Sequence, residues 1–223
     1  DHAWANPVAL GMQIDATLSA AIEAGAKAGA VPRHAVASID WYVQVVEKSL
    51  VHFFYASLYH YLVDGSRHGY DEAVAYFGRS LDGAENFGLA DVIGEVDASC
   101  GTTYGSQVWD ALRAGKGKLD AALVAEGKSG NDDKLNQLTP ELKQLAATID
   151  GQVLEALALA LGHEMLGLQA KDEPAIELIE GRFFAGMVLP YVASIDKAKG
   201  TQHVAGLQSL WQDDPDKVDT ATV

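Results

Sequence analysis

The sequence predicts an all-α protein, a helical bundle built from two tandem repeats of a long-helix hairpin unit. Three observations lead to this fold class. Apolar residues recur at spacings of three and four along most of the chain, and no long stretch alternates apolar with polar residues as a half-buried strand would. The chain also aligns with itself at an offset of 108 residues. We expect one domain over 1–223, with repeat halves at about 7–100 and 103–200.

Proline, glycine and capping residues set the expected helix boundaries. Pro7 opens the first helix, because the fixed backbone angle of proline suits a first turn. Gly65 ends the second helix, and Thr139 is the expected N-cap of the fifth. The expected helices cover about 7–29, 34–63, 71–86, 103–126, 139–169, 172–200 and 202–212.

Other glycines and prolines predict irregularities. The stretch 87–102 is rich in glycine and is ambiguous between helix and loop. Gly115 and Gly117 predict a break or fraying in the fourth helix, and Pro190 predicts a kink in the sixth. An acidic tail is expected over 213–223.

Composition excludes several classes of protein. The chain has 223 residues, 16 Lys and Arg against 31 Asp and Glu, and a net charge of −15. A nucleic-acid binder needs basic residues to neutralise phosphates, so we expect no nucleic-acid partner. No apolar run approaches the roughly 18 residues of a membrane span. Cys100 is the single cysteine, which excludes an internal disulfide and a cysteine-built zinc site.

The internal repeat places acidic residues in register. Its 108-residue offset matches 40–82 with 148–190 without a gap, so each copy has a long helix, an Asp-bearing turn and a second helix with an early glutamate. The aligned pairs are Glu47 with Glu155, Asp64 with Asp172, Glu72 with Glu180, Tyr76 with Phe184, and Leu81 with Leu189.

Four of these acids, Glu47, Glu72, Glu155 and Glu180, are candidate metal ligands. Helical spacing places Glu47 and Glu155 on apolar stripes, and Phe184 follows Glu180 by one turn. A carboxylate on a core-facing stripe is unfavourable unless it is paired, protonated or bound to a metal. Helical bundles hold iron and hard cations with carboxylates from facing helices. The alternative is that these glutamates pair with Lys48, Arg79 or Arg182, or reach solvent.

Histidine and tyrosine extend the candidate site. His52 could ligate a metal through neutral imidazole, and His163 lies eight residues after Glu155 on roughly the same side of its helix. Tyr55 and Tyr59 could act as ferric ligands or support the ligands from behind. The alternative is that the tyrosines belong to an aromatic core with satisfied hydroxyl groups, and that each histidine is structural.

Enzyme motifs are not found in the sequence. It has no G-x-S-x-G, H-E-x-x-H, C-x-x-C-H or phosphate-binding loop, and the Glu-x-x-His spacing of ferritin-like di-iron proteins is missing. We therefore predict no catalytic residue. A metal-dependent oxidase is still a possible class, because sequence does not show whether a metal would keep an open position.

Two segments resemble motifs of the algal Fe-assimilating proteins, also described as low-iron- or high-carbon-dioxide-inducible periplasmic proteins, which have bacterial relatives. The segments are 71–83, which reads DEAVAYFGRSLDG, and 180–190, which reads EGRFFAGMVLP. Glu72 and Glu180 occupy matching motif positions, whereas phenylalanine at 183 and 184 departs from the usual tyrosine. The general look is also similar to imelysin-like or ferritin-like bundles, but the imelysin Gly-x-His-x-x-Glu motif is not met.

The resemblance implies a secreted, helical, iron-linked protein. We expect an extracytoplasmic protein that binds iron, or another divalent metal, and acts in iron acquisition, with its signal peptide removed before Asp1. The metal ion is the expected partner. The alternative is a non-metal helical binding module for a small ligand or a partner protein.

Overall fold

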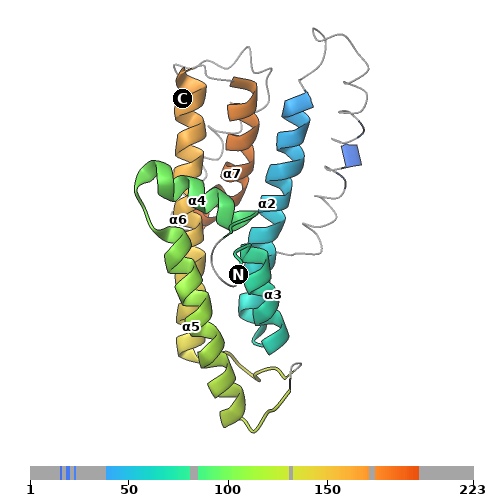
Figure 1. Cartoon of the computed structure of the whole chain (residues 1–223), viewed down its shortest axis with the longest axis vertical. Coiled ribbons are helices and arrows are strands. Elements are labelled where there is room, and N and C mark those ends of the chain that lie inside the picture. Colours follow the sequence, from blue (N-terminus) through green and yellow to red (C-terminus); the bar gives the residue numbers. More distant parts are fainter. Residues whose placement is uncertain are drawn as a thin grey trace. The chain divides into compact units, whose positions relative to one another are not determined.

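The computed structural model describes residues 39–80, 85–130, 133–170 and 174–195, together with the single helical residues Ala16, Ser19, Ala20 and Glu23. Six helices and no strands form these ranges, so the all-α prediction is confirmed (Figure 1). The helices are α2 (Ile39–Asp64), α3 (Arg67–Phe77), α4 (Leu89–Cys100), α5 (Tyr104–Ala125), α6 (Pro140–Ala170) and α7 (Pro174–Ile195). The helix expected at 202–212 and the acidic tail lie outside the described residues, as does the helix expected at 7–29 apart from these four single residues.

The chain divides into two compact units. Of the six helices, unit 1 contains α2 up to His52, α6 from Leu157, and α7. Unit 2 contains the rest of α2 and α6 together with α3, α4 and α5, which pack against one another. Its most deeply buried side chains are Tyr55, Leu58, Phe77, Leu89, Ile93, Leu112, Leu119, Leu123 and Ile149.

Two predicted helices have nearly the predicted bounds. Thr139 caps α6 as expected, because its Oγ1 accepts a hydrogen bond from the Leu142 backbone N–H at 3.3 Å. The helix expected at 103–126 is α5. The expected break or fraying at Gly115 and Gly117 is wrong, because α5 continues through both glycines. Gly115 is buried where helices approach closely. A Cβ there would lie 1.7 Å from the Tyr70 hydroxyl and 2.6 Å from Leu145 Cδ2.

The helix expected at 71–86 begins and ends earlier in the structure. Ser66 caps α3 by accepting a hydrogen bond from the Gly69 backbone N–H at 2.9 Å, so the helix starts at Arg67. Gly78 follows Phe77 with a φ of 85°, which is the left-handed conformation that ends helices. These local caps override the periodicity that extends to residue 86.

The ambiguous glycine-rich stretch contains α4, whose Leu89, Ile93 and Val96 are buried. Asp97 joins this helix to the next one. Its carboxylate accepts hydrogen bonds from Thr102 Oγ1 at 2.7 Å and from the backbone N–H groups of Tyr104 and Gly105, both at 2.8 Å. The acid therefore satisfies the first amides of α5, where a negative charge is favoured.

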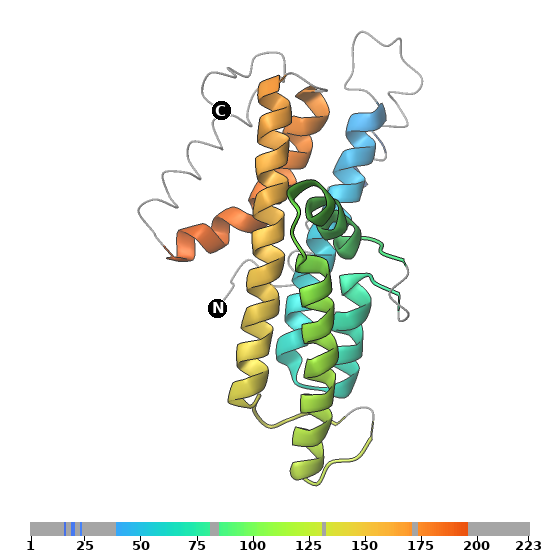
Figure 2. The same cartoon turned by 60° about the vertical axis from the view of Figure 1, so that its left-hand side comes forward.

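Helices α6 and α7 form much of unit 1. Pro190 lies inside α7, and Figure 2 shows the last turns of this helix turned away from the direction of its first turns. Proline removes one helical hydrogen bond and clashes with the preceding turn, which accounts for the bend. In the described chain, α6 is long and apolar enough to cross a membrane, but 44% of its apolar window is buried. Core helices pass the same test.

Substituting Gly115 by alanine should destabilise the protein by about 1–3 kcal/mol, because the new methyl group would overlap the Tyr70 hydroxyl and Leu145. Gly117 is the matched control on the same helix, since a Cβ there meets no atom within 4 Å. Gly117→Ala should raise stability by up to about 1 kcal/mol through helix propensity. Urea unfolding of both variants measures the difference, and equal effects would contradict the close packing.

Candidate functional site

Unit 1 buries a lysine among acidic side chains. Lys48 lies on α2, and its side chain is 7% exposed. Its Nζ lies 3.1 Å from Glu47 Oε1 and 3.5 Å from Glu180 Oε1, and 5.7 Å from the centre of the Phe184 ring. The ammonium group is therefore held by two carboxylates and by the face of an aromatic ring, which also attracts cations.

Two further acids complete the group. Glu164 on α6 is 7% exposed, and its carboxyl is hydrogen-bonded to that of Glu177 on α7. Glu180 lies one turn after Glu177 and is close enough to Glu164 to influence its titration. We call Glu164, Glu177 and Glu180, of which Glu180 is paired with Lys48, the acidic cluster. Glu47 lies at its edge, with 52% of its side chain exposed.

Glycines bring α6 and α7 close together at the acidic cluster. A Cβ on Gly167 would lie 2.4–2.6 Å from the carboxyl atoms of Glu177. A Cβ on Gly181 would lie 2.6 Å from Met165 Cε and 3.5 Å from Glu164 Cβ. The Glu177 carboxyl thus rests directly on the α6 backbone. It occupies the space that the Cβ of any residue other than glycine at position 167 would need.

The electrostatics of the acidic cluster favour protonation. Burial, followed by the hydrogen bond to Glu177 and the charges of Glu180 and Glu177, raises the pKa of Glu164 to about 9. Burial also raises the pKa of Glu180, although the nearby Lys48 opposes this shift. Glu177 Oε2 is buried and has no hydrogen-bond partner among the described residues. At neutral pH a proton on Glu164 therefore relieves the repulsion between carboxyl groups.

The four predicted glutamates are divided between the two units. Glu47 and Glu180 both contact Lys48 in unit 1, as the alternative interpretation of the sequence allowed. Glu72 belongs to unit 2, where its carboxylate lies 3.9 Å from His68 Nε2 with 36% of its side chain exposed. Glu155, also in unit 2, is exposed and accepts a hydrogen bond from Tyr104. The apolar stripe expected around Glu155 includes Leu166, which is 66% exposed.

The two predicted histidines have different environments in unit 1. Burial lowers the pKa of His52 to about 4, so its imidazole is neutral at pH 7. Its Nε2 is buried without a hydrogen-bond partner in the described part of the chain. His163 lies exposed on α6. His52 is thus in the protonation state that a metal ligand requires.

The two predicted tyrosines lie near one aspartate in unit 2. The Tyr55 hydroxyl, which is fully buried, donates a hydrogen bond of 2.7 Å to Asp150 Oδ1. Burial and the charge of Asp150 raise the pKa of Tyr59. Asp150 is itself 7% exposed. The Tyr55 contact is of the kind that the alternative interpretation described, a buried tyrosine with a satisfied hydroxyl group. The Asp150 carboxylate is also a hard oxygen group near both tyrosines.

Sequence analysis did not identify Glu164, Glu177 and Asp150 as site residues. A signal for Glu164 was present, because Leu157, Leu161, Glu164 and Leu168 follow one another at helical spacing and the outer two are buried. Asp150 similarly follows the buried Ile149 and precedes the buried Val153. The pairing of Glu164 with Glu177 depends on which faces of α6 and α7 meet, and periodicity does not give this.

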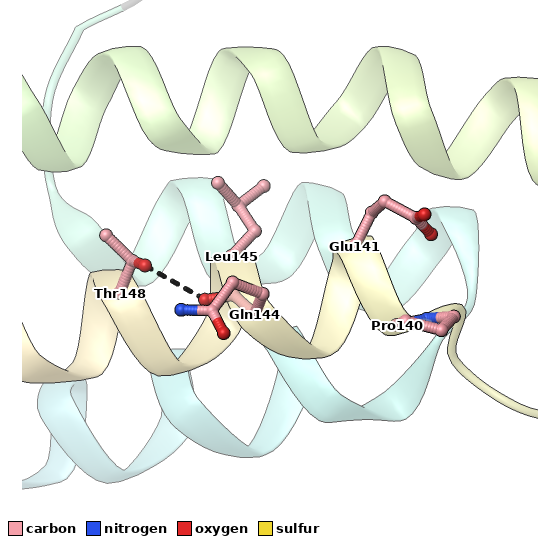
Figure 3. A pocket seen from close by; sticks show the side chains of 5 residues that line it. All are labelled: Pro140, Glu141, Gln144, Leu145 and Thr148. Atoms are coloured by element: carbon pink, nitrogen blue, oxygen red, sulfur yellow. Dashed lines mark hydrogen bonds between the residues drawn. The ribbon is translucent and has the colours of Figure 1, made fainter.

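Unit 2 also has a shallow pocket of about 480 Å³ at the start of α6. Figure 3 shows its lining side chains, with the Thr148 hydroxyl donating to the Gln144 carbonyl oxygen at 2.9 Å. The lining residues are Pro140, Glu141, Gln144, Leu145 and Thr148. None of the predicted site residues lines this pocket.

Comparison with known proteins gives no match, whether with protein-family models, curated proteins or solved structures. Within the described ranges, no group of three or more His, Cys, Asp and Glu side chains has an arrangement that could hold a metal ion. The side chains of the acidic cluster would therefore have to reorient to surround a cation. The site must be judged from its own chemistry.

The Glu164→Gln variant should remove a pH dependence of stability. Between the ordinary glutamate pKa and about 9, the folded protein holds a proton on Glu164 that the unfolded chain releases. Rising pH therefore favours unfolding, by up to about 1 kcal/mol per pH unit. Urea unfolding from pH 5 to pH 9 should show the variant gaining stability relative to the wild type as pH rises. Glu95→Gln, at an exposed position on α4, is the control, and parallel curves for wild type and Glu164→Gln would contradict the burial of a protonated acid.

The Tyr55→Phe variant should lose about 1–3 kcal/mol of stability, because Asp150 would lose a buried hydrogen bond. Tyr104→Phe is the matched control, since Tyr104 donates to the exposed Glu155. Its removal should change stability little. Thermal unfolding of the two variants tests this contrast, and an unchanged melting temperature for Tyr55→Phe would show that the Asp150 contact is energetically neutral.

Proposed function

We propose that this protein binds a hard metal cation, with iron favoured, and acts outside the cytoplasm in iron acquisition. The observation that carries the proposal is the acidic cluster, in which the buried Glu164 of α6 lies with the half-buried Glu177 and Glu180 of α7, and only Glu180 is paired with Lys48. Such a group is unfavourable unless positive charge or protons compensate it. A bound cation would supply that compensation.

The chemistry of the donor groups suits this role. Carboxylate oxygens prefer hard cations such as magnesium, calcium, manganese and iron. Glu164, Glu177 and Glu180 would hold the ion, and the unpartnered Glu177 Oε2 is a donor atom available for it. Lys48 already contacts Glu180, which means that an incoming cation would compete with the ammonium group. Uptake would also release the proton of Glu164, so binding should strengthen as pH rises.

The other predicted ligands belong to the same proposal with different roles. Glu47 lies at the edge of the acidic cluster and is exposed enough to meet an ion arriving from solvent. His52, neutral and without a partner in the described structure, offers a nitrogen ligand in the same unit. Tyr55 and Tyr59 would take a ferric ion only with Asp150 as a third oxygen ligand. Glu72, Glu155 and His163 are exposed to solvent to a third or more and would take part only in a surface contact.

Tandem duplication is a finer part of the proposal. Helix α2 ends at Asp64 and α3 begins at Arg67, while α6 ends at Ala170 and α7 begins at Pro174. These boundaries are separated by close to the 108 residues of the sequence repeat. This similar spacing of helix boundaries supports a common origin of the two halves. The iron-linked role and the periplasmic location rest on the resemblance of 71–83 and 180–190 to the Fe-assimilating proteins.

A second candidate function is a non-metal helical binding module. The observation that favours it is an uncovered apolar stripe on α6, where Leu159 is 37% and Leu166 is 66% exposed. Apolar side chains at this spacing could receive a small ligand or a helix of a partner protein. In that case the acidic cluster would be a structural element compensated by Lys48 and by the Glu164 proton.

Metal titration separates the two functions. Purified protein, loaded with ferrous iron without oxygen and then desalted, should retain iron, and a Glu164→Gln/Glu180→Gln variant should bind it at least about tenfold more weakly. Glu72→Gln is the control, because Glu72 lies in the other unit and is half-exposed. Metal analysis and calorimetry give the readout. Equal iron binding by wild type and the double variant, or no binding by either, would contradict the proposal.

A further inference from the structure

Unit 2 carries a continuous group of aromatic rings from α2 and α3, and a fifth ring in the segment before α4. Phe53 and Tyr76 meet edge to face at 5.7 Å, and Tyr61 stacks on Tyr76 at 5.6 Å with the ring planes 6° apart. Phe54 lies 6.2 Å from both Phe53 and Tyr76. Phe87 lies beside the end of α3, where its Cδ2 would be 3.2 Å from a Cβ on Gly78. We call Phe53, Phe54, Tyr61, Tyr76 and Phe87 the aromatic surface.

These rings are accessible from solvent. Phe87 is 54% exposed, and the other four rings are half-buried. Large aromatic side chains are enriched at protein interfaces, where they give much contact area with little loss of side-chain entropy. A scattered exposed leucine needs no explanation, but four rings in mutual contact, with the exposed Phe87 beside the end of α3, are typical of a binding surface.

Backbone geometry holds the aromatic surface in place. A Cβ on Gly88, whose φ is 59°, would lie 2.7 Å from the Phe54 ring, so the backbone rests directly on that ring. The Phe87 backbone N–H donates to the Gly78 carbonyl oxygen at 2.8 Å. Phe87 is therefore fixed beside the end of α3 although its side chain faces solvent. A surface that is already ordered loses less entropy on binding.

The edge of the aromatic surface is acidic. Burial, the neighbouring Tyr61 and the charge of Glu72 raise the pKa of Tyr76. Glu72 therefore lies near this tyrosine. Glu85 lies exposed two residues before Phe87, and the whole chain has a net charge of −15. The neighbouring Asp71 is paired with Lys116 at 2.7 Å. Charge complementarity therefore favours a cationic partner.

Arginine matches both features of this surface. Its planar guanidinium group stacks on aromatic faces and forms paired hydrogen bonds with a carboxylate, whereas the lysine ammonium is a compact and strongly hydrated charge. We propose that the aromatic surface docks an arginine-bearing segment of a partner protein, with the guanidinium group against the rings and next to Glu72. This inference does not depend on metal binding by unit 1.

Three decapeptides test the proposal: alternating Arg-Gly, alternating Lys-Gly and alternating Glu-Gly. Calorimetry with the whole protein should show the arginine peptide binding about threefold or more tighter than the lysine peptide, and no binding of the glutamate peptide. General attraction to the acidic chain treats the two basic peptides alike and is weakened by salt. The preference for arginine over lysine, which should survive added salt, is therefore the signal of ring stacking.

Variants locate the binding. Phe53→Leu/Phe87→Leu keeps apolar volume but removes two rings, and should abolish the preference for arginine while leaving the fold intact. Phe183→Leu, the same change at a half-buried ring of unit 1, should keep it. Glu72→Gln should weaken both basic peptides, and the arginine peptide more, because only arginine forms paired hydrogen bonds with the carboxylate. Equal binding of the arginine and lysine peptides by wild type, a preference retained by the double variant, or no binding at all would overturn the proposal.

Discussion

The contact of the buried Lys48 ammonium with Glu180 is the constraint on which the organisation of unit 1 depends. The approach of α6 and α7 at Gly167 and Gly181 brings three carboxyl groups together, and Lys48 is paired with one of them, Glu180. Removing one partner of such a buried pair would leave an uncompensated charge. A proton on Glu164 compensates part of the remaining negative charge. A bound cation could take over the same compensation.

The fold could be predicted where local signals act alone. The Thr139 cap, the extent of α5 and the all-α class follow from capping chemistry and from apolar spacing within one helix. The start of α3 was missed, because Ser66 caps the helix five residues before Asp71, where the helix was expected to begin. The predicted break at Gly115 failed for a different reason. Gly115 leaves room for the Tyr70 hydroxyl, and helix propensity does not take such a tertiary contact into account.

The site was only partly predictable for a related reason. An apolar stripe on one helix predicts burial only if another helix covers it, and the stripe with Leu159 and Leu166 is exposed along α6. Glu180 lies on a covered face and is buried, whereas Glu155 is not. Glu164 lies on the covered face of the same helix as Glu155. Sequence spacing therefore places a side chain on a stripe of its helix, while the burial of that stripe depends on packing between helices.

Helix α2 links these observations. Lys48 and Tyr55 are seven residues apart, two turns along one face, and each contacts an acid from a distant part of the chain, Glu180 in unit 1 and Asp150 in unit 2. Buried polar contacts need exact partners, whereas apolar side chains tolerate a shift along the helix axis. Sliding α2 by one turn would preserve much of its apolar burial but separate both pairs. The two polar contacts therefore fix the register of α2 within each unit, and through it the position of every candidate ligand that this helix carries.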